Sequence, residues 1–243
     1  NMKKIVSINP ANNEILKEYE NYNINEVELI IEKLFISYDN WKNKNVQDRI
    51  KILSSIVEHL NENLNSYAEL ITIEMGKPIS ESIAEVKKCI YLCEYYFLNG
   101  ENFLKSEILN FESEKSLIKF EPLGIIFGIM PWNFPFWQVF RFVIPSLISG
   151  NTILLKHASN VSGVSILLDK IINNIYENIF KSITINSDLV ADIISNKYIS
   201  GISFTGSEIA GSKVASSCGK NIKKTVLDLG GADPFIVLDD ASI

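Results

Sequence analysis

The sequence lacks any apolar run long enough to span a bilayer, and no secretion-signal pattern is present at its start. Its three cysteines, Cys89, Cys93 and Cys218, are an odd number without the spacing of a disulfide framework. Acidic residues outnumber basic ones, with 29 Asp and Glu and 23 Lys and Arg, and the sequence has no dense basic patch. We therefore expect neither a membrane nor a nucleic acid as partner, and a cytoplasmic location with reduced thiols.

The chain has 243 residues, 47% of them hydrophobic and 21% charged, which allows one large or two small domains with a substantial core. Turn-forming residues between two short apolar runs predict a hairpin of strands at 5–8 and 15–19. Apolar residues at steps of three and four then predict helices at 25–41, 46–64, 66–75 and 80–100. Asn25 is the expected cap of the first of these helices.

Cys89 and Cys93 lie four residues apart on the last of these helices and share one side of it. A metal-binding pair has this spacing, and so does a pair of small apolar residues packed in a core. We favour packing and expect no metal, because no further Cys or His stands nearby.

Residues 103–120 are short, alternating and charged, a pattern typical of two half-exposed strands. Such strands would form an arm that projects from the domain. Exposed strand edges tend to find partners, so the arm is a candidate contact in a homo-oligomer.

The segment 121–160 organises the rest of the chain. An apolar strand, Leu123 to Met130, stops at the proline-bounded loop 131–135, and an apolar helix follows at 136–148. Gly150-Asn151 then turns the chain into a second apolar strand that ends at Lys156. The crossover length and the unbroken apolar character of both strands predict a parallel sheet that is buried on both faces.

The remaining pattern continues this alternation. It predicts strands at 199–204, 224–229 and 235–238, and helices at 161–176, at 189–194 and from Ser207 to about Cys218, with a weakly patterned stretch at 173–187. The predicted fold class is α/β: a doubly wound, mostly parallel, Rossmann-like sheet.

Ligands of such sheets gather beyond the carboxyl ends of the strands, where Trp132, Asn133, Lys156 and Ser159 fall. A lysine at a strand end can reach ribose hydroxyls or a phosphate, or it can simply be solvated. Asn133 lies in a loop that prolines make rigid, so its amide can be an oxyanion donor or the start of an Asx-turn.

Two further groups stand at strand ends. Gly206 and Gly211 flank the start of a helix with Ser207 as its expected cap; such a start binds phosphate, although a plain strand-to-helix turn also needs small residues. Asp228 ends an apolar strand, where a carboxylate can be a general base with a raised pKa or a partner of loop amides.

Together, five strings resemble the aldehyde dehydrogenase family in order and approximate spacing. They are Pro131-Trp132-Asn133-Phe134-Pro135, Gly150-Asn151-Thr152, Lys156-His157-Ala158-Ser159, Phe204-Thr205-Gly206-Ser207 and Leu227-Asp228-Leu229-Gly230-Gly231. The resemblance extends from near the start of the chain to its last residue. The runs Trp137-Gln138-Val139 and 233–238 look most like the bacterial succinate-semialdehyde dehydrogenase branch.

The resemblance implies a role for each matching residue. Asn133 and Asp228 would be catalytic, as the oxyanion-hole amide and the general base for thioester hydrolysis. Lys156 would hold the adenosine ribose, and Ser159 stands where a glutamate often favours NAD, so NADP or NAD is the expected cofactor. The remaining cofactor-binding candidates are Pro131, Trp132, Gly206, Ser207, Gly211 and Leu229. It further implies that residues 1–102 are the helical N-terminal part, 103–120 the oligomerisation arm and 121–243 the Rossmann-like core.

Three departures accompany the resemblance. Asp228 replaces the family's glutamate and retracts the carboxylate by about 1.5 Å, which can cost about a hundredfold in rate. The Gly-rich turn expected near 181–188 is absent. The family's nucleophilic cysteine follows the Leu-x-Leu-Gly-Gly motif, in a separate catalytic domain, whereas all three cysteines here precede that motif.

We therefore expect a truncated, NAD(P)-dependent aldehyde dehydrogenase that lacks its catalytic domain and is inactive alone. Its full-length form would oxidise an aldehyde, with succinate semialdehyde as one candidate, to a carboxylic acid. A non-catalytic module that binds a nucleotide or a partner is the alternative, and a decayed reading frame without function is a third possibility.

Overall fold

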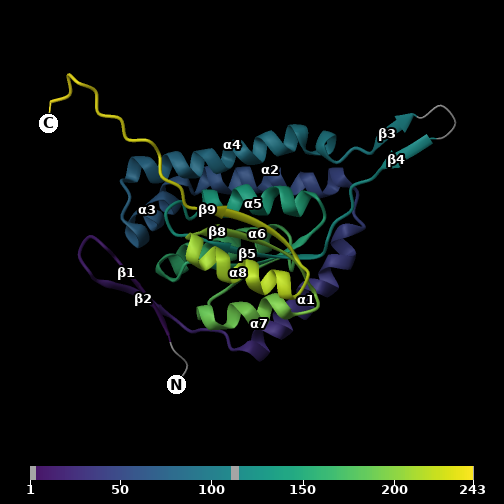
Figure 1. Cartoon of the computed structure of the whole chain (residues 1–243), viewed down its shortest axis with the longest axis horizontal. Coiled ribbons are helices and arrows are strands. Elements are labelled where there is room, and N and C mark those ends of the chain that lie inside the picture. Colours follow the sequence, from purple (N-terminus) through teal and green to yellow (C-terminus); the bar gives the residue numbers. More distant parts are fainter. Residues whose placement is uncertain (1–3, 111–114, 243) are drawn as a thin grey trace.

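A five-stranded parallel sheet in the order β7-β6-β5-β8-β9 forms the centre of the protein (Figure 1). The computed structural model describes residues 4–110 and 115–242. The strands are β5 (Ile125–Met130), β6 (Thr152–His157), β7 (Phe180–Ile183), β8 (Ile199–Gly206) and β9 (Lys224–Leu229). From β5 the chain adds β6 and β7 on one side and β8 and β9 on the other, so the predicted doubly wound sheet is confirmed.

Helices cover both faces of the sheet (Figure 1). One face carries α1 (Ile24–Lys42), α7 (Val190–Ser195) and α8 (Glu208–Lys220). The other carries α5 (Trp137–Ile148) and α6 (Ser162–Ile175), with α2 (Val46–Glu62), α3 (Leu64–Met75) and α4 (Ile79–Phe103) as a further layer over them. A hydrophobic core lies on each face of the sheet, and alternate residues of β5 pack into one core or the other. Ile125 and Phe127 pack with α1, whereas Ile126 and Met130 pack with α5.

The start of α5 is bonded to a side chain from the outer layer. The carboxylate of Glu85 in α4 accepts the backbone N–H groups of Phe136 and Trp137, at 2.8 and 2.9 Å. Lys77, which is also buried, donates to the same carboxylate at 2.6 Å. The backbone N–H groups at the start of α5, which have no acceptor within the helix, are thus hydrogen-bonded, and the buried charge of Glu85 is balanced by that of Lys77.

The end of α5 is bonded in the same way. The carbonyl oxygen of Leu147 accepts from the indole of Trp41 at 2.9 Å, and that of Ile148 accepts from the Arg49 guanidinium at 2.8 Å. Both donors are buried and come from α1 and α2. The N-terminal helices therefore fix α5, and with it the loop that precedes α5, at both ends.

The predicted N-terminal elements are observed with small shifts. The hairpin consists of β1 (Ile5–Ile8) and β2 (Ile15–Tyr19), and the four helices are α1 to α4. Asn23 caps α1, so the prediction of Asn25 was wrong: the Asn23 side chain and that of Glu26 bond each other's backbone N–H in a capping box. Cys89 and Cys93 are buried in the core, as the packing interpretation predicts.

Three predicted boundaries in the second half were wrong. Strand β7 lies in the stretch 173–187 that showed only weak patterning, because a four-residue edge strand is too short for a clear period. The strand predicted at 235–238 is not formed: Phe235 is 93% exposed, and β9 pairs there with no further strand among the described residues. Lys156 lies inside β6, one residue before its end.

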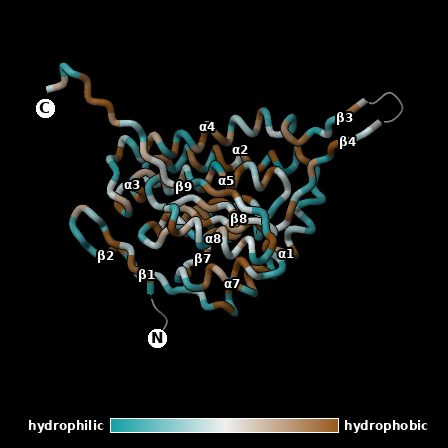
Figure 2. Tube along the Cα trace, in the orientation of Figure 1, coloured by the Kyte–Doolittle hydropathy of each residue, from teal (hydrophilic) through white to brown (hydrophobic). Residues whose placement is uncertain are grey.

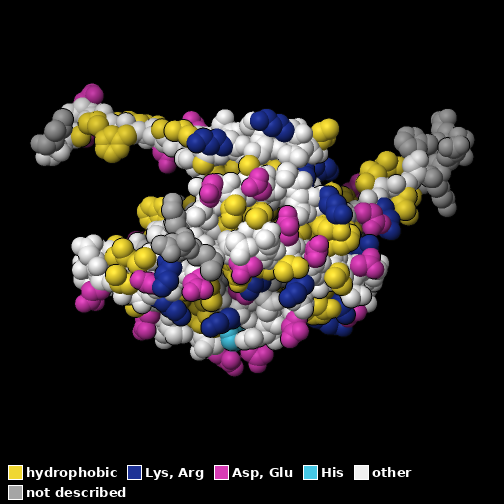
Figure 3. All heavy atoms as spheres, turned by 90° about the horizontal axis from the view of Figure 1, so that it is seen from below, with side chains coloured by type: hydrophobic (Ala, Val, Ile, Leu, Met, Phe, Trp, Pro, Cys, Tyr) yellow, Lys and Arg dark blue, Asp and Glu magenta, His cyan; other side chains and the backbone are white. Residues whose placement is uncertain are grey.

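A two-stranded arm of β3 (Glu107–Asn110) and β4 (Lys115–Ile118) projects from the body, as predicted (Figure 1). Its residues 111–114 lie outside the described part. The arm has exposed apolar side chains, Ile108 and Leu117 among them. Hydrophobic residues also recur along the C-terminal segment (Figure 2), and Figure 3 shows hydrophobic side chains on the surface of both projections. The homo-oligomer stays a prediction, which the mass in solution by light scattering would decide. Within residues 4–110 and 115–242, no helix is long and apolar enough to cross a membrane.

Candidate functional site

The candidate residues from four strands gather at one edge of the sheet, where the carboxyl ends of β5, β6, β8 and β9 lie side by side. The register aligns Ile129 with Lys156 and with Phe204, and Phe204 with Leu227. Because side chains alternate along a strand, Lys156 and Asp228 face opposite sides of the sheet. The structure thus divides the candidates between two hollows, one on each face.

The first hollow has a volume of about 330 Å³ and lies on the face covered by α7 and α8. Its residues are either apolar, hydroxylic or basic, and no carboxylate is among them. They are Ile129, Lys156, Ser187, Val190, Ala191, Phe204, Ala210, Lys213, Val214 and Ser217. A cavity of this size falls at the lower end of the range for small-molecule sites.

Lys156 is the largely buried cation of this hollow. Within the described part of the chain its ammonium makes one hydrogen bond, a long one of 3.5 Å from Nζ to the carbonyl oxygen of His157. No carboxylate of the described residues lies within ion-pair distance, and burial lowers the pKa of the Lys156 ammonium. Burial of an unpaired charge is costly, so this position suits a site that an anion or ribose completes.

The start of α8 opens beside this hollow. Ser207 caps the helix as predicted, its hydroxyl accepting the N–H of Ala210 at 3.4 Å. Gly211 has a packing role, because a Cβ there would lie 2.4 Å from the Leu229 side chain. The predicted cofactor residues Gly206, Ser207, Gly211 and Leu229 are therefore brought together where α8 meets β8 and β9.

The starts of α5 and α6 are already filled by carboxylates. Glu85 occupies that of α5, and the buried Glu74 accepts the N–H groups of Gly163 and Val164 at the start of α6, both at 2.8 Å. Burial raises the pKa of Glu74, and its hydrogen bonds oppose that shift. Three helices longer than two turns follow strands of this sheet: α5, α6 and α8. Of these, within the described residues, only α8 has no carboxylate that accepts its first backbone N–H groups, so its start remains available to an anion.

The loop between β5 and α5 presents Pro131, Trp132 and Asn133 at the same edge. Trp132 and Asn133 are exposed. The Asn133 side-chain oxygen accepts the N–H of Phe134 at 3.1 Å, which leaves both amide N–H donors without an acceptor among the described residues. Asn133 can therefore hold the local turn through its side-chain oxygen and still donate a hydrogen bond from its side-chain nitrogen to a ligand. Lys77 lies 3.9 Å from the centre of the Phe134 ring and helps to fix the loop.

Ser159 lies two residues beyond the end of β6. It is exposed, begins a 3₁₀ turn at Ser159–Val161 and uses its carbonyl oxygen to accept from Ser162 at 2.7 Å. It does not line the 330 Å³ hollow.

The second hollow, about 750 Å³, lies on the α5 face and includes Trp137, Arg141, Phe142, Thr205 and Asp228. The Asp228 carboxylate is about half exposed and forms an ion pair with Arg141. It is therefore not the desolvated carboxyl that a strand end suggested. Arg141 was missed by the sequence analysis; its signal was that it is the one charged residue of a largely apolar helix.

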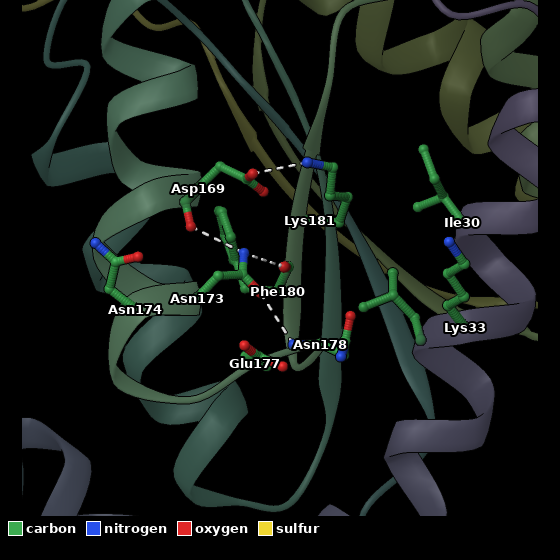
Figure 4. Close-up of a pocket in the computed structure, with 10 residues that line it drawn as sticks. Ile30, Lys33, Asp169, Asn173, Asn174, Glu177, Asn178, Phe180 and Lys181 are labelled. Carbon is green, nitrogen blue, oxygen red and sulfur yellow. Dashed lines mark hydrogen bonds and ion pairs between the residues drawn. The ribbon is translucent and has the colours of Figure 1, made fainter.

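A third hollow, about 420 Å³, lies between α1, α6 and β7 (Figure 4). Several of its polar groups bond within the hollow: Asp169 pairs with Lys181 at 2.7 Å, and Asn173 bonds the backbone of Phe180 and of Asn178. None of the candidate residues from the sequence lies in it.

The sequence analysis also missed residues that support the site rather than form it. Glu85 lies on the buried stripe of α4 with Val86 and Cys89, and an acid on an apolar stripe was the available signal. Lys77 was interpreted only as part of a helix stop, and Lys213 carried no signal in the sequence.

Known proteins resemble this chain throughout. The sequence pattern described as the aldehyde dehydrogenase family matches residues 1–243. A probable succinate-semialdehyde dehydrogenase [NADP(+)] of Synechocystis is 37% identical over 241 residues, which are 98% of this chain and 53% of that protein. A succinate semialdehyde dehydrogenase [NAD(P)+] of Escherichia coli is 37% identical over 240 residues, 98% of this chain and 52% of that one.

Solved structures agree. A succinic semialdehyde dehydrogenase from Streptococcus pyogenes, solved in complex with NADP+, superimposes with a TM-score of 0.93 at 32% identity. The match covers 98% of this chain and 53% of that one. The chain thus spans about half the length of the relatives that it matches.

His157 at the end of β6 predicts a pH dependence of folding. Its Nε2–H donates to the Pro135 carbonyl at 2.9 Å and its Nδ1 accepts from Ala158 N–H at 2.9 Å, so only the neutral ring fits. Burial lowers the pKa of His157 from 6.5 to about 4. Below pH 6.5 the unfolded chain takes up the proton first, so stability falls as the pH drops towards 4.

Between pH 7.5 and 5.0 we expect His157 to account for a loss of about 2 kcal/mol in the free energy of unfolding. Urea unfolding of the wild type and of His157→Gln, which keeps a donor to Pro135, measures that contribution as the difference between their pH dependences. Equal pH dependences would contradict the assignment.

Proposed function

Because the chain belongs to the aldehyde dehydrogenase family, we propose that it is the cofactor-binding part of an NAD(P)-dependent oxidoreductase that acts on an aldehyde. The full-length form would oxidise the aldehyde to a carboxylic acid. Succinate semialdehyde is the candidate substrate, since relatives at 34 to 37% identity are named for it. The observation that carries the proposal is the unpaired Lys156 in a cavity beside the open start of α8.

The residues present fit an adenine dinucleotide. In this proposal Lys156 donates to the adenosine ribose, and the first amides of α8 with the Ser207 hydroxyl bind the pyrophosphate. Pro131, Trp132 and Leu229 border the same edge and limit the access of water. When bound, the cofactor supplies the hydride acceptor for the aldehyde carbon.

Asn133, from the loop between β5 and α5, and Asp228, from the α5 face of the sheet, are the proposed catalytic residues. The free N–H donors of Asn133 suit an aldehyde oxygen on which negative charge develops. Asp228 would take a proton from the hydrolytic water, which requires its carboxylate to exchange Arg141 for that water. An aspartate also reaches less far than the glutamate of the family.

The cysteines favour the second candidate function for the chain on its own, a non-catalytic nucleotide-binding module. Cys89, Cys93 and Cys218 are all buried, and burial raises the pKa of the first two thiols. None is placed to attack an aldehyde as an exposed thiolate. We therefore propose that this chain binds the cofactor without turning over the substrate.

Replacement of Lys156 by Met should separate binding from stability. The variant loses the cation that contacts the cofactor, so the affinity for NADP+ should fall roughly tenfold or more. Because an unpaired buried charge is removed, the free energy of unfolding without ligand should rise by about 1 kcal/mol. Calorimetric titration and urea unfolding measure the two effects; unchanged affinity would contradict the role of Lys156.

The isolated chain should form no NADPH from NADP+ and succinate semialdehyde. A full-length aldehyde dehydrogenase assayed in parallel serves as the positive control, followed by absorbance at the reduced-nicotinamide band. The expected result is binding of NADP+ without turnover. Turnover above a substrate-free blank, lost in the Asn133→Ala variant, would contradict the predicted inactivity.

A further inference from the structure

Helix α8 contributes a second lysine to the cavity of Lys156. Lys213 lines the 330 Å³ hollow from the covering helix, and Lys156 lines it from β6. Lys213 is exposed, and within the described residues its ammonium has neither a carboxylate partner nor a hydrogen bond. The cavity therefore has two cations without counter-charges.

The uncharged polar groups of the cavity are also suited to an anion. Ser187 begins the 3₁₀ turn Ser187–Leu189, and Ser217 lies on α8 one helical turn beyond Lys213. Hydroxyls donate to phosphate oxygens as readily as they do to carbonyl groups. Val190 and Val214 provide the apolar walls.

The charge of this cavity bears on which cofactor binds. A dinucleotide site that selects NAD places a carboxylate on the ribose 2′-hydroxyl, whereas a cationic side chain there accommodates the 2′-phosphate of NADP. No Asp or Glu lines this cavity. A 2′-phosphate would supply the counter-charge that both lysines lack.

We propose that Lys213, together with Lys156, binds the 2′-phosphate of NADP and so makes the chain select NADP over NAD. The inference rests on the proposed function, because it assumes that an adenine dinucleotide enters this cavity. It assigns a part in the selectivity to α8, which is additional to any part of Ser159, a residue that does not itself line the cavity.

The test compares two lysines of one helix. Calorimetric titration of the 243-residue chain with NADP+ and with NAD+ is carried out on the wild type, Lys213→Gln and Lys220→Gln. Lys220 lies in the last turn of α8, is exposed and does not line the cavity, so its variant carries the same change of charge. Thermal unfolding confirms that each variant is folded.

Wild type should bind NADP+ more tightly than NAD+. Lys213→Gln should lose roughly tenfold in affinity for NADP+ and nothing for NAD+, while Lys220→Gln should match the wild type. Lys213→Glu should reverse the preference, because its carboxylate repels the phosphate.

Two other outcomes are distinguishable. Equal weakening of both dinucleotides by Lys213→Gln, or no weakening of either, would overturn the selectivity role while cofactor binding itself stands. Failure of folded wild type to bind either dinucleotide would overturn the proposed function, and the inference with it.

Discussion

The buried pair of Glu85 and Lys77 is the interaction on which the site depends. Glu85 bonds the first amides of α5, and Lys77 balances its charge while lying against the ring of Phe134. Removal of one partner from a buried ion pair typically costs about 3 to 5 kcal/mol, since the other charge is left uncompensated. The loop with Asn133 is thus held by a part of the chain that contributes no residue to the proposed cofactor cavity, which gives the N-terminal half a direct part in shaping the site.

The same arrangement decides where an anion can bind. A helix start attracts negative charge wherever its amides are free. Glu85 and Glu74 use those amides at α5 and α6, so of the three longer helices that follow strands of the central sheet in the described residues, α8 is the one whose start has no carboxylate on its first amides. The alternation of side chains then separates Lys156, which faces the cavity under α8, from Asp228, which faces α5. The proposed cofactor-binding lysine and the proposed general base therefore lie on opposite faces of one sheet.

The local sequence pattern was enough to predict most of the fold and to identify the candidate residues at the strand ends. Apolar periods and turn residues predicted the helices, the arm and the parallel sheet, and the Ser207 cap was confirmed. The pattern failed where the decisive contact is distant in the sequence. Strand β7 exists because β6 offers it an edge, and the apolar run 235–238 pairs with no strand among the described residues. Neither the contact of Glu85 with Phe136, which are 51 positions apart, nor the approach of Lys213 to the cavity produces a periodic pattern in the sequence.

Hydrogen–deuterium exchange of the chain with and without NADP+ tests the central claim most directly, namely that α8 provides the open helix start. Without ligand, the amides of Phe136, Trp137, Gly163 and Val164 should already exchange slowly, because carboxylates accept them. Addition of NADP+ should slow exchange in the first turn of α8, from Glu208, and leave those four amides unchanged. Protection that appears instead at the starts of α5 or α6 would contradict the account.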